Sequence, residues 1–143
     1  MMKILFVCHG NICRSVMAEY MLKNKLRIRG IQDDFVVTSC ATTSEEIGAD
    51  IYYAAKEILN KYNIPYEKHS ARKINLHDIT DNDLIICMDK ENLNDLYYYF
   101  GKNPKIRRLL VNRDVSDPWW TRDFETTYTD IDKGLDSLLQ EIC

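Results

Sequence analysis

Residues 4–15 read ILFVCHGNICRS, and this stretch decides the fold. The apolar run at residues 4–7 is typical of a buried strand, and the amphipathic segment that begins near Val16 predicts a helix. Successive backbone N–H groups in the loop between them can surround an anion, and the N-terminus of the helix adds roughly half a positive charge. The stretch therefore predicts a strand, a loop that fits a tetrahedral dianion, and a helix.

Two residues of this loop carry reactive chemistry. Cys8 leaves the strand, and Arg14 stands six positions later at the start of the helix. A free thiol titrates near pH 8.5, but a helix N-terminus and a neighbouring guanidinium lower the pKa of such a group to roughly 3.5–7.5, so we expect a thiolate at Cys8. A thiolate can attack phosphorus and split the slow hydrolysis of a phosphate monoester into two steps. We expect Arg14 to hold two phosphoryl oxygens.

The other loop residues shape the anion site. Gly10 permits a turn with positive φ and a close backbone approach, and Asn11 tolerates the left-handed region and can tie the loop together with its amide. The hydroxyl of Ser15 is expected to donate to the Cys8 sulfur. The residues expected to bind phosphate are His9, Gly10, Asn11, Ile12, Cys13 and Ser15.

A second motif, Asp117-Pro118-Trp119-Trp120, can supply the proton that a leaving phenolate needs. We expect it on a loop over the pocket, where partial burial of Asp117 favours the protonated acid. The alternative is that Asp-Pro marks an ordinary turn. Trp119 and Trp120 are expected to wall the entrance, where flat aromatic surface suits a phenol ring, unless one of them belongs to the core.

The loop and several later segments resemble the low-molecular-weight protein tyrosine phosphatase family. The family signature is V-C-x-G-N-I-C-R-S, and this sequence matches every fixed position from Val7 to Ser15. Further segments that resemble the family, in family order, are residues 39–42, 46–48, 69–72, 86–89 with 92–93, 117–120 and 123–125. Val16 replaces a proline that is favoured but not required in the first helical turn. Glu45 replaces an aromatic pocket wall, which bears on substrate preference.

The resemblance implies a flavodoxin-like three-layer α/β fold with a central four-stranded parallel sheet, formed by residues 1–143 as one domain. It implies a protein tyrosine phosphatase with Cys8 as nucleophile, Arg14 as phosphate clamp and Asp117 as general acid and then base. His69 would support the site by hydrogen-bonding within the phosphate-loop network. The expected partner is a phosphotyrosine-containing protein or peptide, and the expected state is a monomer or weak dimer.

The remaining candidates are an acidic residue after a later strand, two histidines and a second cysteine of the loop. Asp89 follows a strand-like segment and is expected to support the edge of the site, whereas His9 and His77 are expected to be exposed. Cys13, inside the loop, can form a reversible disulfide with Cys8 that shields the nucleophile from over-oxidation.

Composition narrows the class of protein. The 143 residues are 45% hydrophobic and 29% charged, with a net charge of −3, which fits one compact enzyme and disfavours nucleic acid or a membrane surface as partners. No targeting segment or membrane span is visible, and five cysteines without secretory features suggest reduced thiols, so we expect a cytoplasmic protein. The cysteines and histidines lack zinc-site spacing, so we expect no metal and no cofactor. The basic residues 105–108 are expected to form a solvated strand edge.

Short apolar runs alternate with helical patterns along the chain. Strands are expected at residues 3–7, 35–39, 84–87 and 106–111, and helices at 14–29, 50–62, 90–100 and from 123 onward. This alternation predicts a parallel sheet covered on both faces. The ligand site of such a sheet lies off the carboxyl ends of its strands, where Cys8, Asp89 and Asp117 are expected to meet.

Three other functions stay open. Arsenate reductases share the fold and a similar loop but relay oxidation through a further cysteine pair, and Cys87 has no second cysteine nearby. Phosphoarginine phosphatases tend to carry threonine where Ile12 stands, and since a hydroxyl there can help to position water, isoleucine favours phosphotyrosine. The third is a phosphoprotein-binding module without turnover, which intact Cys8, Arg14 and Asp117 disfavour.

Overall fold

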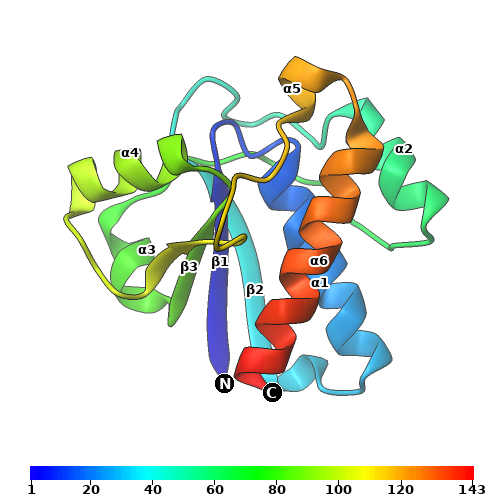
Figure 1. The fold of residues 1–143 in the computed structure, drawn as a ribbon, viewed down its shortest axis with the longest axis horizontal. Helices are drawn as coiled ribbons and strands as arrows, with labels where there is room; N and C mark the ends of the chain where they lie inside the picture. Colours follow the sequence, from blue (N-terminus) through cyan, green and yellow to red (C-terminus); the bar gives the residue numbers. More distant parts are fainter.

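The four strands form one parallel sheet in the order β2-β1-β3-β4 (Figure 1). The computed structural model describes residues 1–143. Its strands are β1 Met2–Cys8, β2 Phe35–Ala41, β3 Leu84–Cys87 and β4 Ile106–Arg108. Because β1 lies between β2 and β3, the direction of the strand order reverses there, as in flavodoxin-like folds. The predicted three-layer α/β fold with a central four-stranded parallel sheet is confirmed.

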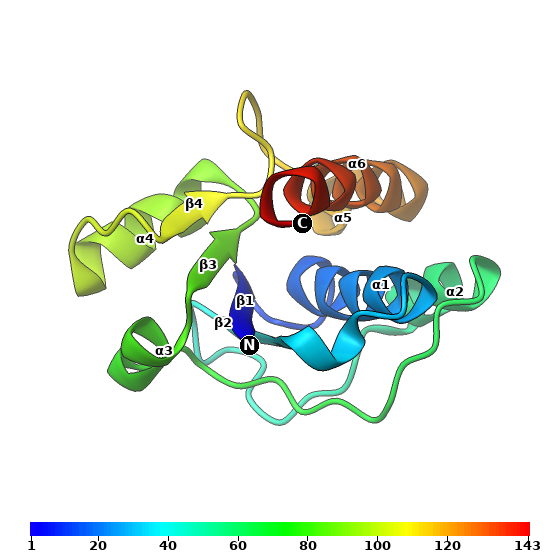
Figure 2. The same ribbon diagram turned by 90° about the horizontal axis from the view of Figure 1, so that it is seen from below.

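Helices cover both faces of the sheet (Figure 2). One face carries α1 Arg14–Ile28, α2 Tyr53–Lys61 and α6 Phe124–Ile142, and the other carries α3 Leu76–Asp81 and α4 Lys90–Phe100. The remaining elements are a 3₁₀ turn at Gln32–Asp34 and the short α5 Pro118–Thr121. None of these helices has both the length and the apolar composition that crossing a membrane requires.

Alternate side chains of β1 enter two separate cores, because successive residues of a strand point to opposite faces. Ile4 and Phe6 belong to the core beneath α1, α2 and α6. Leu5 and Val7 belong to the core shared with α3 and α4. All four side chains are fully buried, so the packing of β1 fixes the point at which the following loop begins.

Two elements are shorter than predicted. α2 begins at Tyr53 and not at residue 50, because the backbone of Tyr52 is extended and its N–H donates to the Ile12 carbonyl in the loop after β1. β4 ends at Arg108 and not at residue 111, because its partner β3 ends at Cys87 and offers no further pairing. The other predicted elements lie within two residues of the observed bounds.

Two short helices were not predicted, and both begin at side-chain caps. Asn75 and Asp78 form a reciprocal capping box at the start of α3. Asp117 accepts the backbone N–H of Trp119 at the start of α5, so the segment predicted as a loop is a helical turn that begins with Pro118.

The topology brings the ends of β1 and β3 to one edge of the sheet, and Figure 1 shows α5 at this end of the molecule, opposite the two chain termini. His9 and His77 are exposed, as predicted. The basic side chains of residues 105–108 are paired within the chain: Lys105 donates to the Asn82 carbonyl, Arg107 to Glu141 and Arg108 to Asp114.

Candidate active site

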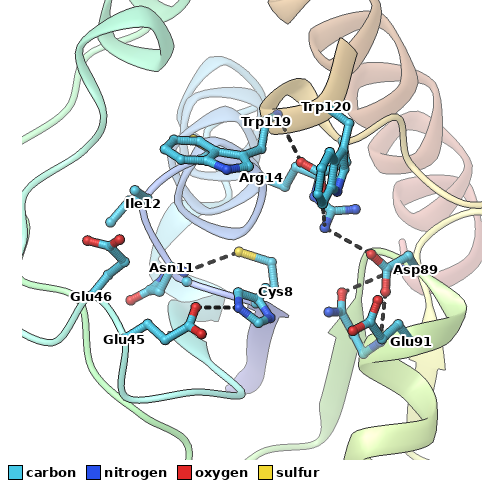
Figure 3. Close-up of a pocket in the computed structure, with 15 residues that line it drawn as sticks. Cys8, Asn11, Ile12, Arg14, Glu45, Glu46, Asp89, Glu91, Trp119 and Trp120 are labelled. Atoms are coloured by element: carbon cyan, nitrogen blue, oxygen red, sulfur yellow. Dashed lines mark hydrogen bonds and ion pairs between the residues drawn. The ribbon is translucent and has the colours of Figure 1, made fainter. Parts of the chain in front are cut away.

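A pocket of about 290 Å³ opens at the carboxyl ends of β1 and β3. Its walls come from the loop after β1, the segment after β2, the start of α4, and α5 with the residue before it (Figure 3). The lining residues are Cys8, His9, Gly10, Asn11, Ile12, Cys13, Arg14, Glu45, Glu46, Asp89, Glu91, Asn92, Asp117, Trp119 and Trp120. Of the predicted site residues, Ser15 and His69 do not line the pocket.

The Cys8 sulfur is surrounded by hydrogen-bond donors. The backbone N–H groups of Asn11 and Ser15 donate to Sγ over 3.3 and 3.4 Å, and the Ser15 hydroxyl oxygen lies 3.0 Å from Sγ. Because α1 begins at Arg14, the positive end of its dipole also lies at the loop. These groups stabilise a negative charge on the sulfur, as a nucleophilic thiolate requires.

The side chain of Asn11 ties the loop to the sheet. Its Nδ2 donates to Oγ of Ser15 over 2.8 Å and to Oγ of Ser39 over 2.9 Å, and its Oδ1 accepts the N–H of Arg72. Because Ser15 accepts from Asn11, its own hydroxyl proton is available to donate to Cys8. The Asn11 amide therefore orients the hydroxyl that lies against the Cys8 sulfur.

Two details of the loop differ from the prediction. Asn11 adopts positive φ, at 61°, whereas Gly10 does not. A Cβ at position 10 would lie 3.4 Å from Cγ of Glu46, an ordinary van der Waals distance, so neither a positive φ nor lack of space requires glycine there. Ser15, predicted among the phosphate-binding residues, is fully buried, contacts the thiol and does not line the pocket.

Residues outside the pocket hold the loop from behind. The Ser39 hydroxyl donates to Oε1 of the buried Glu19 over 2.6 Å. Nε2 of His69 lies 2.7 Å from the Asn11 carbonyl oxygen and donates to it. Sequence reasoning did not place Ser39 or Glu19 at the site, because Ser39 reaches Asn11, and Glu19 reaches Ser39, only once β2 and α1 pack beside β1.

Arg14 is buried and bound by acceptors from the far side of the pocket. Its Nη1 donates to the Val115 carbonyl over 3.1 Å, and its Nη2 lies 2.9 Å from Oδ2 of Asp89 and 3.5 Å from Oδ2 of Asp117. Burial lowers the pKa of the guanidinium, but the negative charges of Cys8, Asp117 and Asp89 outweigh it and raise the pKa. Arg14 therefore stays positive and fixed in orientation.

Asp117 stands at the rim opposite the loop, with its side chain 32% exposed. Its Oδ1 accepts the Trp119 N–H over 3.0 Å, which leaves Oδ2 directed toward Arg14. Trp119 and Trp120 are 48% and 81% exposed and lie on either side of Arg14 in Figure 3, so neither belongs to the core. The two indoles offer apolar surface beside a carboxyl group and a bound guanidinium.

Burial keeps three of the other thiols protonated. It raises the pKa of Cys13 to about 12 and that of Cys87 to about 12, and it raises the pKa of Cys40 further. All five cysteines are free thiols. Cys13, although it lines the pocket, is therefore protonated at neutral pH.

Carboxylates form much of the outer rim. Glu45 and Glu46 follow β2, and Glu91 lies in the first turn of α4. Nε2 of His9 lies 2.5 Å from Oε2 of Glu45, so a side chain where the family often carries an aromatic residue is held against the loop. Sequence reasoning did not place Glu46 or Glu91 among the site residues, although both follow carboxyl ends of predicted strands.

No group of three or more His, Cys, Asp or Glu side chains is arranged to hold a metal ion. The chemistry that the pocket can perform therefore has to be read from its thiol, guanidinium and carboxyl groups. A stabilised sulfur, a fixed cation and a carboxyl group around one cavity suit nucleophilic attack on a phosphoryl group followed by proton transfer.

Comparison with known proteins agrees with this chemistry. The sequence profile described as low molecular weight phosphotyrosine protein phosphatase matches residues 3–143. The chain belongs to this family. Among relatives of this phosphatase, YfkJ of Bacillus subtilis is 35% identical over 99% of the chain and 96% of its own length, and its crystal structure matches with a TM-score of 0.94.

Two other solved structures are similar to this phosphatase. The enzyme SP-PTP of Streptococcus pyogenes is 35% identical, with a TM-score of 0.93 over 100% of this chain and 94% of its own. An arginine phosphatase of Drosophila is 30% identical, with a TM-score of 0.88 over 98% of this chain and 97% of its own. The family membership makes this phosphatase a hydrolase.

Proposed function

We propose that this phosphatase hydrolyses phosphotyrosine in proteins and peptides, and smaller aryl phosphates, through a phosphocysteine on Cys8, with residues 1–143 as one catalytic domain. The observation that carries the proposal is the arrangement of the Cys8 sulfur, with its N–H donors, opposite Arg14 and Asp117 in one pocket. Arg14 has five N–H donors and uses three contacts within the protein, so donors remain for phosphoryl oxygens.

In the first step, the Cys8 thiolate attacks phosphorus as the bond from phosphorus to the phenolic oxygen breaks. The sulfur–phosphorus bond forms, and Asp117 in its acid form donates a proton to the leaving oxygen. Backbone N–H groups of the loop and the Arg14 guanidinium stabilise the charge on the three equatorial oxygens. The alcohol product, tyrosine, then leaves.

In the second step, water hydrolyses the phosphocysteine. Asp117, now a carboxylate, takes a proton from the water whose oxygen attacks phosphorus, and the sulfur–phosphorus bond breaks. Inorganic phosphate leaves, and the thiolate of Cys8 and the acid form of Asp117 are restored. The hydrogen bond from Ser15 makes the sulfur a better leaving group, because it stabilises the thiolate.

Apolar surface at the rim supports an aromatic substrate over phosphoarginine. Ile12 and Trp119 both line the pocket, and an indole prefers to pack against a flat ring. Ile12 has no hydroxyl with which to position water. In this proposal Trp119 and Trp120 flank the phenol ring, Asp89 positions Arg14, and His69 supports the Asn11 carbonyl.

The nucleophile is tested by measuring turnover of a phosphotyrosine peptide by Cys8→Ser. We expect no turnover and retained competitive binding of inorganic phosphate, because a hydroxyl in the same loop is a far weaker nucleophile. Cys40→Ser is the matched control, a second buried thiol that lies outside the pocket. Turnover by Cys8→Ser, or faster hydrolysis of phosphoarginine than of phosphotyrosine by the wild type, would contradict the proposal.

The acid is tested with Asp117→Asn. Since general acid catalysis contributes about 10²–10⁴-fold, kcat/KM for phosphotyrosine should fall within this range. The loss should be much smaller for p-nitrophenyl phosphate, whose leaving group needs no proton. The wild-type rate should also decline at alkaline pH in a way that Asp117→Asn lacks. An unchanged rate with phosphotyrosine would remove Asp117 from the mechanism.

A further inference from the structure

The segment that carries Asp117 has few hydrogen bonds to the rest of the protein. From Asp117 to Arg122, its hydrogen bonds stay within the segment and its immediate neighbours, apart from the 3.5 Å contact between Asp117 and Arg14. A four-residue helix such as α5 has little stability of its own. The position of the Asp117 carboxyl group therefore depends on how the side chains of this segment pack.

Pro118 of this segment is buried, and the Arg122 guanidinium lies 5.5 Å from the centroid of the Trp119 ring. The aromatic part of the packing comes from the ring of Tyr52. Its centroid lies 5.6 Å from the Trp119 ring in an edge-to-face arrangement, and 6.1 Å from the Phe124 ring in a stacked one. Trp119 is two residues after Asp117, and Phe124 opens α6. One aromatic ring thus packs against Trp119 within the segment and against Phe124 just after it, and aromatic pairs of this kind contribute about 0.5–1.5 kcal/mol beyond the area they bury.

Tyr52 is itself fixed to the phosphate loop. Its N–H donates to the Ile12 carbonyl over 2.9 Å, and its own carbonyl accepts the N–H groups of Ala55 and Lys56 at the start of α2. Ala55 is fully buried in the larger core, so α2 provides a rigid base. Figure 1 shows α5 and the start of α2 at the same end of the molecule. Tyr52 therefore connects the loop that holds the nucleophile to the segment that holds the acid.

We propose that Tyr52 is a positioning residue for the general acid: its ring sets the position of Asp117 relative to Cys8 through Trp119. The inference rests on the proposed role of Asp117. A misplacement of about 1 Å can cost about 10²-fold in rate, because proton transfer needs a narrow range of donor–acceptor geometry. Binding of the phosphoryl group does not depend on Tyr52's ring, because the loop and Arg14 keep their contacts.

The test compares kcat/KM of Tyr52→Leu for two substrates, since this parameter covers the step in which the leaving group departs. Leucine keeps the backbone N–H and an apolar side chain but removes the ring. We expect kcat/KM to fall about tenfold or more for phosphotyrosine, and to fall less than about threefold for p-nitrophenyl phosphate. Inhibition by inorganic phosphate should be unchanged, and Tyr52→Phe should restore the wild-type rates.

Tyr62→Leu is the matched control. Tyr62 follows α2 and stacks on Tyr128 of α6 with centroids 3.9 Å apart, so this change also removes aromatic packing between α2 and α6 but far from Asp117. The inference would be overturned if kcat/KM of Tyr52→Leu fell equally for both substrates or did not fall at all. It would also be overturned if Tyr62→Leu showed the same difference between the two substrates. Asp117→Asn measured in parallel separates the two proposals, because it alone reports whether Asp117 protonates the leaving group.

Discussion

Replacing Arg14 with lysine measures how much of the reaction depends on a planar guanidinium instead of on positive charge. The side chain is 4% exposed, and its two terminal nitrogens serve the Val115 carbonyl at 3.1 Å and Asp89 at 2.9 Å while facing the pocket. A lysine has one nitrogen, which cannot reach both partners and two phosphoryl oxygens at the same time.

The magnitude follows from the contacts that are lost. Removing one aligned donor to a transition-state oxyanion costs about 10²–10³-fold in kcat, or about 2.7–4 kcal/mol. Leaving the buried carbonyl of Val115 without a donor costs about 1–3 kcal/mol of folding stability. We therefore expect Arg14→Lys to be folded, with a lower melting temperature, and to lose about 10²–10³-fold in kcat.

The assay is steady-state hydrolysis of p-nitrophenyl phosphate and a phosphotyrosine peptide, with thermal melts followed by circular dichroism. Arg107→Lys is the control, because Arg107 makes a two-point pair with Glu141 on the surface. A folded Arg14→Lys enzyme with kcat within about tenfold of the wild type would refute the reasoning, since charge alone would then be sufficient.

Three further outcomes test packing and titration. In Gly134→Ala the new Cβ would lie 2.5 Å from Cγ of Leu109. We therefore expect the free energy of unfolding, measured by denaturant melts, to fall by about 1–3 kcal/mol despite the better helix propensity of alanine. Unchanged stability would contradict this. Burial raises the pKa of Cys13 to about 12, so iodoacetamide at pH 7 should modify Cys8 before Cys13 in peptide mapping by mass spectrometry. Hydrogen bonds from a lysine of α2 and two backbone N–H groups lower the pKa of Asp50 from 3.8 to about 2. The contribution of Asp50 to stability is therefore complete above about pH 4 and disappears as the pH falls toward 2. Asp50→Asn should flatten that part of the curve of unfolding free energy against pH.

The reactive loop could be predicted from the sequence because its parts are contiguous. The apolar run of β1, the loop and the start of α1 follow one another at residues 4–15, so the N–H donors around Cys8 arise from local backbone geometry. The alternation of apolar runs and helical patterns likewise predicted the parallel sheet, because strands buried on both faces are continuous apolar runs and the helices that cover them are amphipathic.

Other features depended on neighbours that no local pattern reveals. The prediction of positive φ at Gly10 was wrong because the left-handed residue of the loop is Asn11, whose amide is held by Ser15 and by Ser39 of β2. The start of α2 was predicted too early because Tyr52 gives its N–H to Ile12 instead of to a helix. Secondary-structure propensity predicts neither the backbone of this loop nor the start of α2, since each is set by contacts with a segment distant in sequence.

The sequence by itself determined which residue types surround Cys8 and the strand-loop-helix that presents them. Only the tertiary structure decided which groups face that loop: Asp89 and Asp117 lie 75 and 103 positions from Arg14 along the chain. They reach it because β3 pairs directly with β1 and because the Val115 N–H, two residues before Asp117, donates to the Met88 carbonyl just after β3. Hydrogen bonds within the loop follow from adjacent dihedral angles, whereas these contacts exist only once the strands have paired and the helices have packed on the sheet.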